Sequence, residues 1–144
     1  MFEAVVQRTY DAINRQDVHG IMKAWADDAV FELTGRSRIS GRYEGKAAIE
    51  GFFRHLFARM ERIHITVQHV GFANPLGFSY RNTMYVEFEA DETTREGQSV
   101  HAEVIGVFRI RRGKTVLLRE LWLDQSLLEQ VWGVAVPVET SVLK

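Results

Sequence analysis

The sequence contains no cysteine, and this absence excludes disulfide bonds and thiolate metal sites. It also has no excess of either charge, because 18 lysines and arginines stand against 19 aspartates and glutamates, for a formal net charge of -1. The basic residues are spread along the chain rather than clustered. We therefore expect neither a nucleic-acid partner nor an anionic membrane surface.

Long apolar runs are absent too, since no stretch approaches the length of a membrane span. The first residues carry an acid and lack the basic start and apolar run of a signal peptide. These absences predict a cytoplasmic protein with no membrane partner. The length of 144 residues is that of one ordinary domain, so we expect a single domain over residues 1–144.

Apolar residues recur at helical spacing in the first half of the chain. This spacing predicts an amphipathic helix over residues 2–16, then a short helix that Asp17 caps and that carries Trp25 inward. A third helix follows from Lys46 to Met60. Residues 29–33 are predicted to be a strand, and the glycine-rich and charged segment after them an irregular stretch or weak strand.

After residue 60 the apolar period changes to two, which is typical of strands. Strands are predicted over residues 63–70, 78–90, 98–111 and 116–124, with a charged hairpin loop over 91–98 and a last helical turn or two ending near Gly133. Helices followed by hairpin-linked strands indicate an α+β fold. We expect a curved antiparallel sheet wrapped around the helices, with an apolar conical pocket between them.

Three segments occur in the order AVVQRTYDAINRQDVHGIMKAWADDAVFE, GKAAIEGFFRHLF and VIGVFRIRRGK. Together they resemble the NTF2-like superfamily, and within it the SnoaL-like domain, over nearly the whole chain. The resemblance implies the cone-shaped fold of that superfamily, which includes ketosteroid isomerases and limonene-epoxide hydrolases. It implies no single activity, because this cone supports many chemistries.

The catalytic positions of the ketosteroid isomerases fall here on Thr9, Leu33 and Gly106. Leucine and glycine carry no exchangeable side-chain proton, and threonine is a far weaker acid than the tyrosine it replaces. The isomerases' specific mechanism is therefore excluded. Tyr10 stands one position beyond the tyrosine position and is expected to point elsewhere.

Two other families suggest catalytic residues. Similarity to the epoxide hydrolases puts Glu120 at the position of the aspartate that activates water, and puts Asn82 and Met84 at the positions of an arginine-aspartate pair. Similarity to scytalone-type dehydratases puts His69 at the position of a catalytic histidine. Glu120 and His69 are thus the catalytic candidates.

The segment LLRELWLDQ shows how Glu120 is expected to act. In a strand, Glu120 shares one face with Leu118 and Trp122, and the carboxyl group would lie in the cone. Poor solvation raises a carboxyl pKa and suits a general acid or base, whereas the alternative is an ion pair with Arg36 or another neighbour. The predicted substrate-binding residues are Asn82, Met84, Ala102, Val104, Trp122, Trp25 and Leu33.

The same strand is apolar on both faces, but the helices cover only one. The other face predicts a symmetric homodimer through the outer side of the sheet, where His101 would also lie. Asp124 is expected to cap the last helix. We expect no metal and no cofactor, since no ligands at metal-binding spacing share a face. The predicted function is cofactor-free proton transfer or water activation on a hydrophobic small molecule; the alternative is a non-catalytic binding protein for such a molecule.

Overall fold

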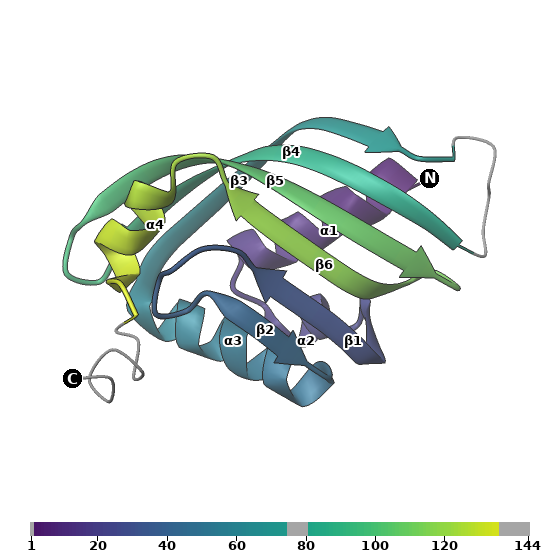
Figure 1. Cartoon of the computed structure of the whole chain (residues 1–144), viewed down its shortest axis with the longest axis horizontal. Coiled ribbons are helices and arrows are strands. Elements are labelled where there is room, and N and C mark those ends of the chain that lie inside the picture. The colour runs from purple at the N-terminus through teal and green to yellow at the C-terminus, as the bar shows by residue number, and fades with distance from the viewer. Residues whose placement is uncertain (1, 75–80, 136–144) are drawn as a thin grey trace, which may run out of the picture.

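The structure is a computed structural model that describes residues 2–74 and 81–135. Its described part is an α+β fold of helices packed against one curved sheet (Figure 1). The strand predicted over residues 78–90 begins with residues 78–80, which lie outside the described residues. The elements in chain order are α1 (Phe2–Asn14), α2 (Val18–Met22), β1 (Trp25–Leu33), β2 (Gly41–Glu44), α3 (Lys46–Arg59), β3 (Met60–Phe72), β4 (Arg81–Thr94), β5 (Ser99–Arg111), β6 (Lys114–Trp122) and α4 (Gln125–Trp132).

The six strands form one sheet in the order β2-β1-β6-β5-β4-β3. Every neighbouring pair is antiparallel except β1 and β6, which run parallel. The prediction of a purely antiparallel sheet is therefore wrong at this pairing. The pairing joins residues 30–33 to residues 117–120, and the alternation of a short strand does not reveal its direction relative to a distant partner.

Capping residues mark the start of α2 and both ends of α4 as predicted, whereas α1 ends at Asn14 rather than at the predicted residue 16. The Asp17 carboxylate accepts a hydrogen bond from the Gly20 N–H at the start of α2, and the Asp124 carboxylate accepts one from the Ser126 N–H at the start of α4. Helix α4 ends at Gly133, whose φ of 79° is in the left-handed region that favours glycine. These caps fix the points at which α2 and α4 begin.

Trp25 was predicted in the second helix but is the first residue of β1. The Thr115 N–H of β6 donates to the Ala24 carbonyl, and Trp25 pairs with Thr115 in the sheet. These bonds to β6 draw the chain into the sheet directly after α2 ends at Met22. Trp25 is still buried, with its ring centroid 6.2 Å from that of Phe31.

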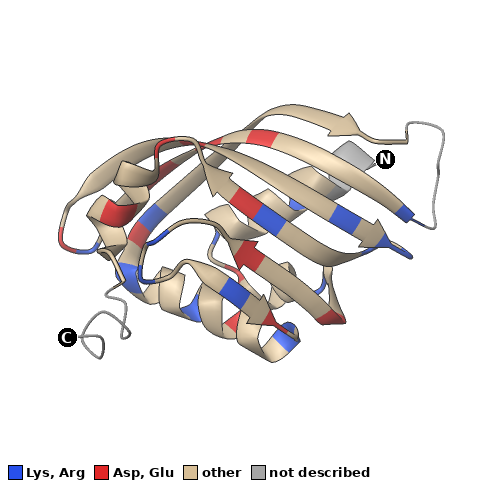
Figure 2. Ribbon diagram, viewed as in Figure 1, with Lys and Arg blue, Asp and Glu red and all other residues tan. Residues whose placement is uncertain are grey.

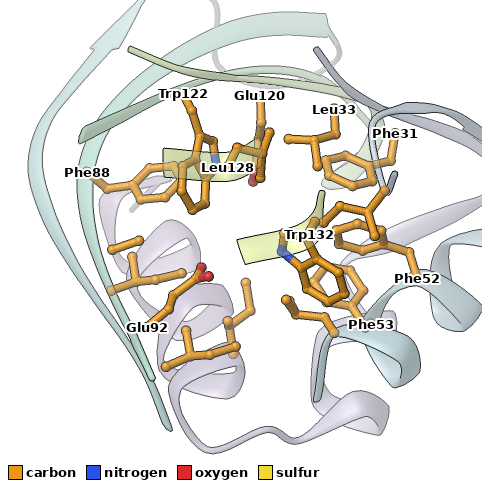
Figure 3. A pocket seen from close by; sticks show the side chains of 16 residues that line it. Phe31, Leu33, Phe52, Phe53, Phe88, Glu92, Glu120, Trp122, Leu128 and Trp132 are labelled. Carbon is orange, nitrogen blue, oxygen red and sulfur yellow. The ribbon is translucent and has the colours of Figure 1, made fainter. Parts of the chain in front are cut away.

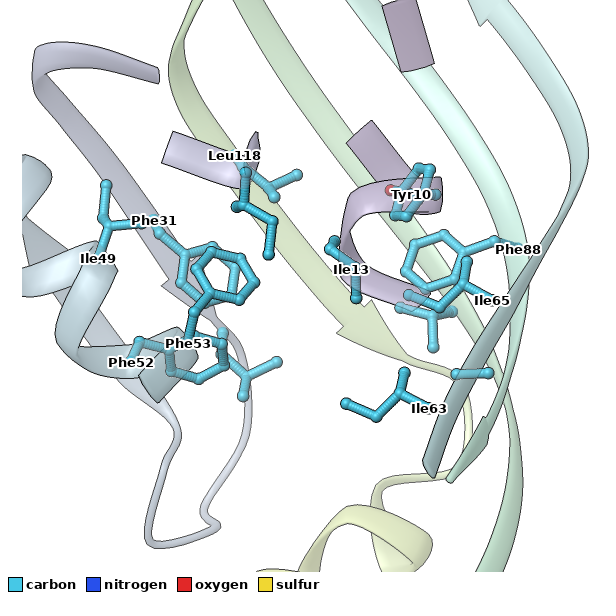
Figure 4. Close-up of a cluster of buried hydrophobic side chains, with 14 of the residues drawn as sticks. Tyr10, Ile13, Phe31, Ile49, Phe52, Phe53, Ile63, Ile65, Phe88 and Leu118 are labelled. Carbon is cyan, nitrogen blue, oxygen red and sulfur yellow. The ribbon is translucent and has the colours of Figure 1, made fainter. Parts of the chain in front are cut away.

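Aromatic side chains form two groups in the core, one on each side of the fold (Figure 4). Phe31 of β1 packs edge-on against Phe52 of α3, with ring centroids 4.7 Å apart, and also stacks with Phe53. On the other side Tyr10 of α1 packs against Phe88 of β4 at 4.9 Å. The walls of the helical side of the sheet are therefore largely aromatic.

Charged residues of both signs are interspersed along the strands and helices (Figure 2). On the outer face of the sheet Glu32 of β1 accepts hydrogen bonds from Arg42 of β2 at 2.6 Å and from Arg119 of β6 at 2.8 Å. The hydrogen bond from Arg119 is the main reason why the pKa of Glu32 lies below its usual value. None of the helices in the described ranges is long and apolar enough to cross a membrane.

The outer face of the sheet leaves large apolar side chains exposed. Tyr85 is 47% exposed, Leu121 43% and Leu123 54%, and the register places half-buried Ile105 beside Leu121 and half-buried Val107 beside Tyr85. Exposed apolar side chains that gather on one face of a sheet are typical of interaction surfaces. Homodimerisation through this face stays a prediction.

A charge on this face tests the dimer. If two copies meet here, Leu121→Lys places two lysines in a buried apolar interface, and we expect the dimer dissociation constant to rise at least about tenfold. The measurement is molar mass against protein concentration by light scattering after size exclusion. Ala47→Lys, on the exposed side of α3, is the control and should leave the mass unchanged. A wild-type protein that is monomeric at high concentration would contradict the dimer.

Candidate functional site

A cavity of about 50 Å³ lies between the sheet and the helices, enough for several water molecules or a small organic group. Seven helices and strands and the loop that contains Ile39 supply its lining, which is mainly aromatic and aliphatic (Figure 3). Its two ionisable residues are Glu92 and Glu120. The lining residues are Ile13, Phe31, Leu33, Ile39, Phe52, Phe53, Leu56, Ile63, Ile65, Phe88, Ala90, Glu92, Glu120, Trp122, Leu128 and Trp132.

Glu120 points into this cavity from β6, between Trp122 and Leu33 (Figure 3). Its backbone is held in place because its carbonyl accepts hydrogen bonds from both the N–H and the hydroxyl of Thr34, each at 3.0 Å. Within the described ranges its carboxyl group has no hydrogen-bond or ion-pair partner. The ion-pair alternative fails for Arg36, which binds Glu129 at 3.2 Å instead.

Glu92 is a second acid in the cavity, and it was missed in the sequence because residues 91–98 were predicted to be a loop. Strand β4 continues to Thr94, and Glu92 pairs with Ile63 of β3 and Val100 of β5. Its side chain reaches the cavity from the wall opposite Glu120 (Figure 3). Glu92 is 8% exposed, and its Oε1 atom is buried with no hydrogen-bond partner among the described residues.

Burial shifts both acids in the same direction. It raises the pKa of Glu92 to about 7. It also raises the pKa of Glu120 to about 8, with the charge of Glu92 as the second cause. Two acids that interact this way titrate as a pair. Near neutral pH the cavity therefore holds at least one carboxylic acid that can donate a proton, and ionisation of the pair supplies a base.

Tyr10 of α1 is buried near enough to Glu120 to feel its charge, although it is not among the residues that line the cavity. It faces the core with Val6 and Ile13, the α1 neighbours four positions before it and three after it, and is 1% exposed. Its hydroxyl has no hydrogen-bond partner in the described part of the chain. Burial raises the pKa of the Tyr10 phenol well above its usual value, and the charge of Glu120 raises it further. Tyr10 is therefore a neutral phenol close to Glu120.

His69 does not reach the cavity, so its predicted inward placement is wrong. A bulge at Gln68 shifts the register, because Val67 pairs with Phe88 while His69 pairs with the next residue, Glu87. The extra residue turns every later side chain of β3 to the opposite face. The His69 side chain is 79% exposed on the outer face, 3.9 Å from Glu87.

The structure gathers three of the predicted site residues, Glu120, Trp122 and Leu33, around one cavity. The other predicted binding residues lie away from it. Asn82 lines an outer hollow and its amide donates to the Asn74 carbonyl, because β4 carries it past the end of the core. Met84 lines a separate small pocket. Trp25, Ala102 and Val104 are buried but are absent from the cavity lining.

On the outer face of the sheet, His101 Nδ1 and the carboxyl group of Asp91 share a hydrogen bond of 2.7 Å. Asp91 precedes Glu92 on β4 and points outward. The bond to Asp91 raises the pKa of His101. Within residues 2–74 and 81–135, no three histidine, aspartate or glutamate side chains are grouped so that they could hold a metal ion. The ionisable groups that line the cavity are two carboxyl groups in an apolar enclosure.

The family model of the SnoaL-like domain matches residues 6–118, so the chain belongs to the SnoaL-like family. Its solved structural relatives share the NTF2-like fold. An NTF2-like protein of unknown function from Burkholderia pseudomallei has 17% identity and a TM-score of 0.77, over 90% of this chain and 95% of that one. Bal32a, from a soil-derived mobile gene cassette, has 22% identity and a TM-score of 0.78 over the same shares.

A third relative, TerC crystallised with polyporic acid, has 16% identity and a TM-score of 0.68, over 90% of this chain and 95% of that one. These likenesses establish the fold. A search of curated proteins finds no match. The activity must therefore be argued from the residues of the cavity.

Proposed function

We propose that this protein transfers protons on a hydrophobic small molecule bound in the cavity, with Glu120 as the general acid or base and Glu92 as its partner acid. One observation carries the proposal: two carboxyl groups with raised pKa values line one small apolar cavity. Acids poised near neutral pH transfer protons efficiently in either direction. Isomerisation, cyclisation, dehydration and hydrolysis all need such a step.

The two acids have different roles in this proposal. When the pair holds one proton, the ionised carboxylate removes a proton from the substrate while the protonated carboxyl donates a hydrogen bond to the oxygen on which negative charge develops. The aromatic walls keep bulk water away from both groups, which strengthens these interactions. No cofactor is needed for this chemistry.

The alternative is a non-catalytic protein that binds a hydrophobic molecule, with Glu120 as a polar anchor. The observation in its favour is that Leu33 and Gly106, at the isomerases' acid and base positions, carry no proton to transfer. A turnover measurement on a bound ligand separates the two functions.

A titration of Glu120 by nuclear magnetic resonance tests the proposal most directly. We expect a midpoint at about 8 instead of the usual value near 4.5, because the carboxyl group is desolvated and faces a second acid. The carboxyl signal of Glu120 is assigned by its loss in Glu120→Gln. Glu103→Gln, on the exposed outer face, is the control and should leave that signal in place. A midpoint near this usual value, which is that of a solvated glutamate, would remove the basis for proton transfer.

A further inference from the structure

Neither acid of the cavity accepts a hydrogen bond from a described residue, although the lining also carries the indole N–H groups of Trp122 and Trp132. Glu92 Oε1 is buried with no donor in the described ranges, and the Glu120 carboxyl has no partner there either. An ionised carboxylate accepts hydrogen bonds and donates none. The group that complements this cavity is therefore rich in N–H donors or carries positive charge.

The protein supplies no such charge from the described lining, which contains no lysine, arginine or histidine. The guanidinium that contacts the lining is that of Arg59, whose carbon lies 5.4 Å from the Trp132 ring centroid. Its Nη2 donates to the Val131 carbonyl at 2.8 Å, and its Nη1 lies 3.7 Å from Glu96. Both Nη atoms of Arg59 are thus engaged by other groups, and its buried Nε has no hydrogen-bond partner among the described residues.

The walls that surround the two acids also favour a cation. Six of the lining residues are aromatic: Phe31, Phe52, Phe53, Phe88, Trp122 and Trp132. The faces of such rings attract positively charged groups, and they do so more strongly away from water. A neutral apolar ligand would fill the same space but give neither carboxyl group a hydrogen-bond donor, nor a counter-charge when it ionises.

We propose that the ligand of this cavity is a small organic cation, namely a protonated amine or quaternary ammonium group on an apolar body. The inference rests on the proposed site and specifies its substrate class. The cation would lie between Glu92 and Glu120, with its apolar carbons against the aromatic rings. The cavity of about 50 Å³ admits a compact ammonium group of this kind.

Binding of a cation also prepares the site for chemistry. Positive charge between two carboxyl groups favours their ionised forms, so ligand binding releases protons from the pair. Glu120 becomes a base when the cation arrives, next to the carbon atoms of the ligand. The free protein keeps the pair largely protonated and avoids two buried charges.

Piperidinium and tetrahydropyran test this inference, because they are six-membered rings that differ mainly in a charged NH₂ group in place of an oxygen. Titration calorimetry near pH 7.5, in two buffers of different ionisation enthalpy, gives affinity and proton release together. We expect piperidinium to bind at least about tenfold more tightly and to release up to about one proton. Its affinity should rise with pH through the range in which the pair titrates.

Glu92→Gln isolates the charge. We expect this substitution to weaken the affinity for piperidinium at least about tenfold and to leave the affinity for tetrahydropyran unchanged. Glu87→Gln, on the outer face of the same strand, should change neither affinity. Tetrahydropyran binding as tightly as piperidinium, or failure of piperidinium to bind, would overturn the inference. The wild-type comparison decides the question even if the variant folds poorly.

The two proposals fail separately. A raised Glu120 midpoint with no preference for the cation refutes the organic-cation ligand and leaves proton transfer standing. An ordinary Glu120 midpoint with tight piperidinium binding refutes proton transfer and supports an amine-binding protein.

Discussion

Glu120→Gln should abolish most of the proton-transfer activity on neutral ring ketones while binding of these ketones survives. The amide has the shape of the acid but cannot donate or accept a proton at neutral pH, and a positioned general acid or base typically contributes about 10²–10⁴-fold to a rate. We therefore expect turnover to fall by about that factor. An effect confined to turnover would place Glu120 in the chemical step rather than in binding.

Proton transfer can be followed without knowledge of the natural substrate. Incorporation of deuterium next to the carbonyl of ring ketones such as cyclohexanone, and of amino ketones that carry a protonated nitrogen, reports removal of a carbon-bound proton. Glu103→Gln, an exposed outer-face acid on the adjacent strand β5, should exchange at the wild-type rate. Equal exchange by Glu120→Gln and wild type would show that Glu120 is not the base, and a wild-type protein that binds these ketones without exchange would favour the binding function.

Glu92→Gln should make the protein more stable at high pH and reduce the dependence of stability on pH. The folded-state pKa of Glu92 is raised to about 7 from a usual 4.5, so the folded state binds more protons than the unfolded state between these values. The resulting stability is fully present below the unfolded pKa and is lost as pH rises through the folded pKa. At 1.36 kcal/mol per pKa unit the loss amounts to at most about 3 kcal/mol.

The measurement is the free energy of unfolding from denaturant titrations near pH 5 and near pH 8. The wild type should lose stability between them, and Glu92→Gln should lose less and be the more stable of the two near pH 8 by about 1–3 kcal/mol. Glu87→Gln, exposed on the same strand, should follow the wild type. The same decline in wild type and Glu92→Gln would mean that Glu92 is not protonated in the folded state near neutral pH.

The periodicity of the chain predicted the helices and strands well, because each depends on neighbours a few residues away. Asp17 and Asp124 cap their helices, and Leu118, Glu120 and Trp122 of β6 face inward as alternation requires. Glu92 obeys the same alternation as Met84 and Phe88. It could have been found by extending that strand through the charged residues after Ala90.

His69 and Tyr10 show where local patterns mislead. One extra residue at Gln68 reverses the face of the end of β3, and alternation alone cannot reveal a bulge that depends on pairing with β4. Tyr10 was judged by its offset from a family position, whereas its own helical neighbours Val6 and Ile13 already marked the buried face.

The sequence by itself determined the fold class, the capped starts of α2 and α4 and the presence of an acid on an apolar strand, since these follow from composition, spacing and family resemblance. Tertiary structure decided the parallel pairing of β1 with β6 and the meeting of Glu92 with Glu120 in one cavity. These features join residues far apart in the chain. The pKa of each acid depends on what surrounds it in space, and that environment exists only when the sheet closes around the helices.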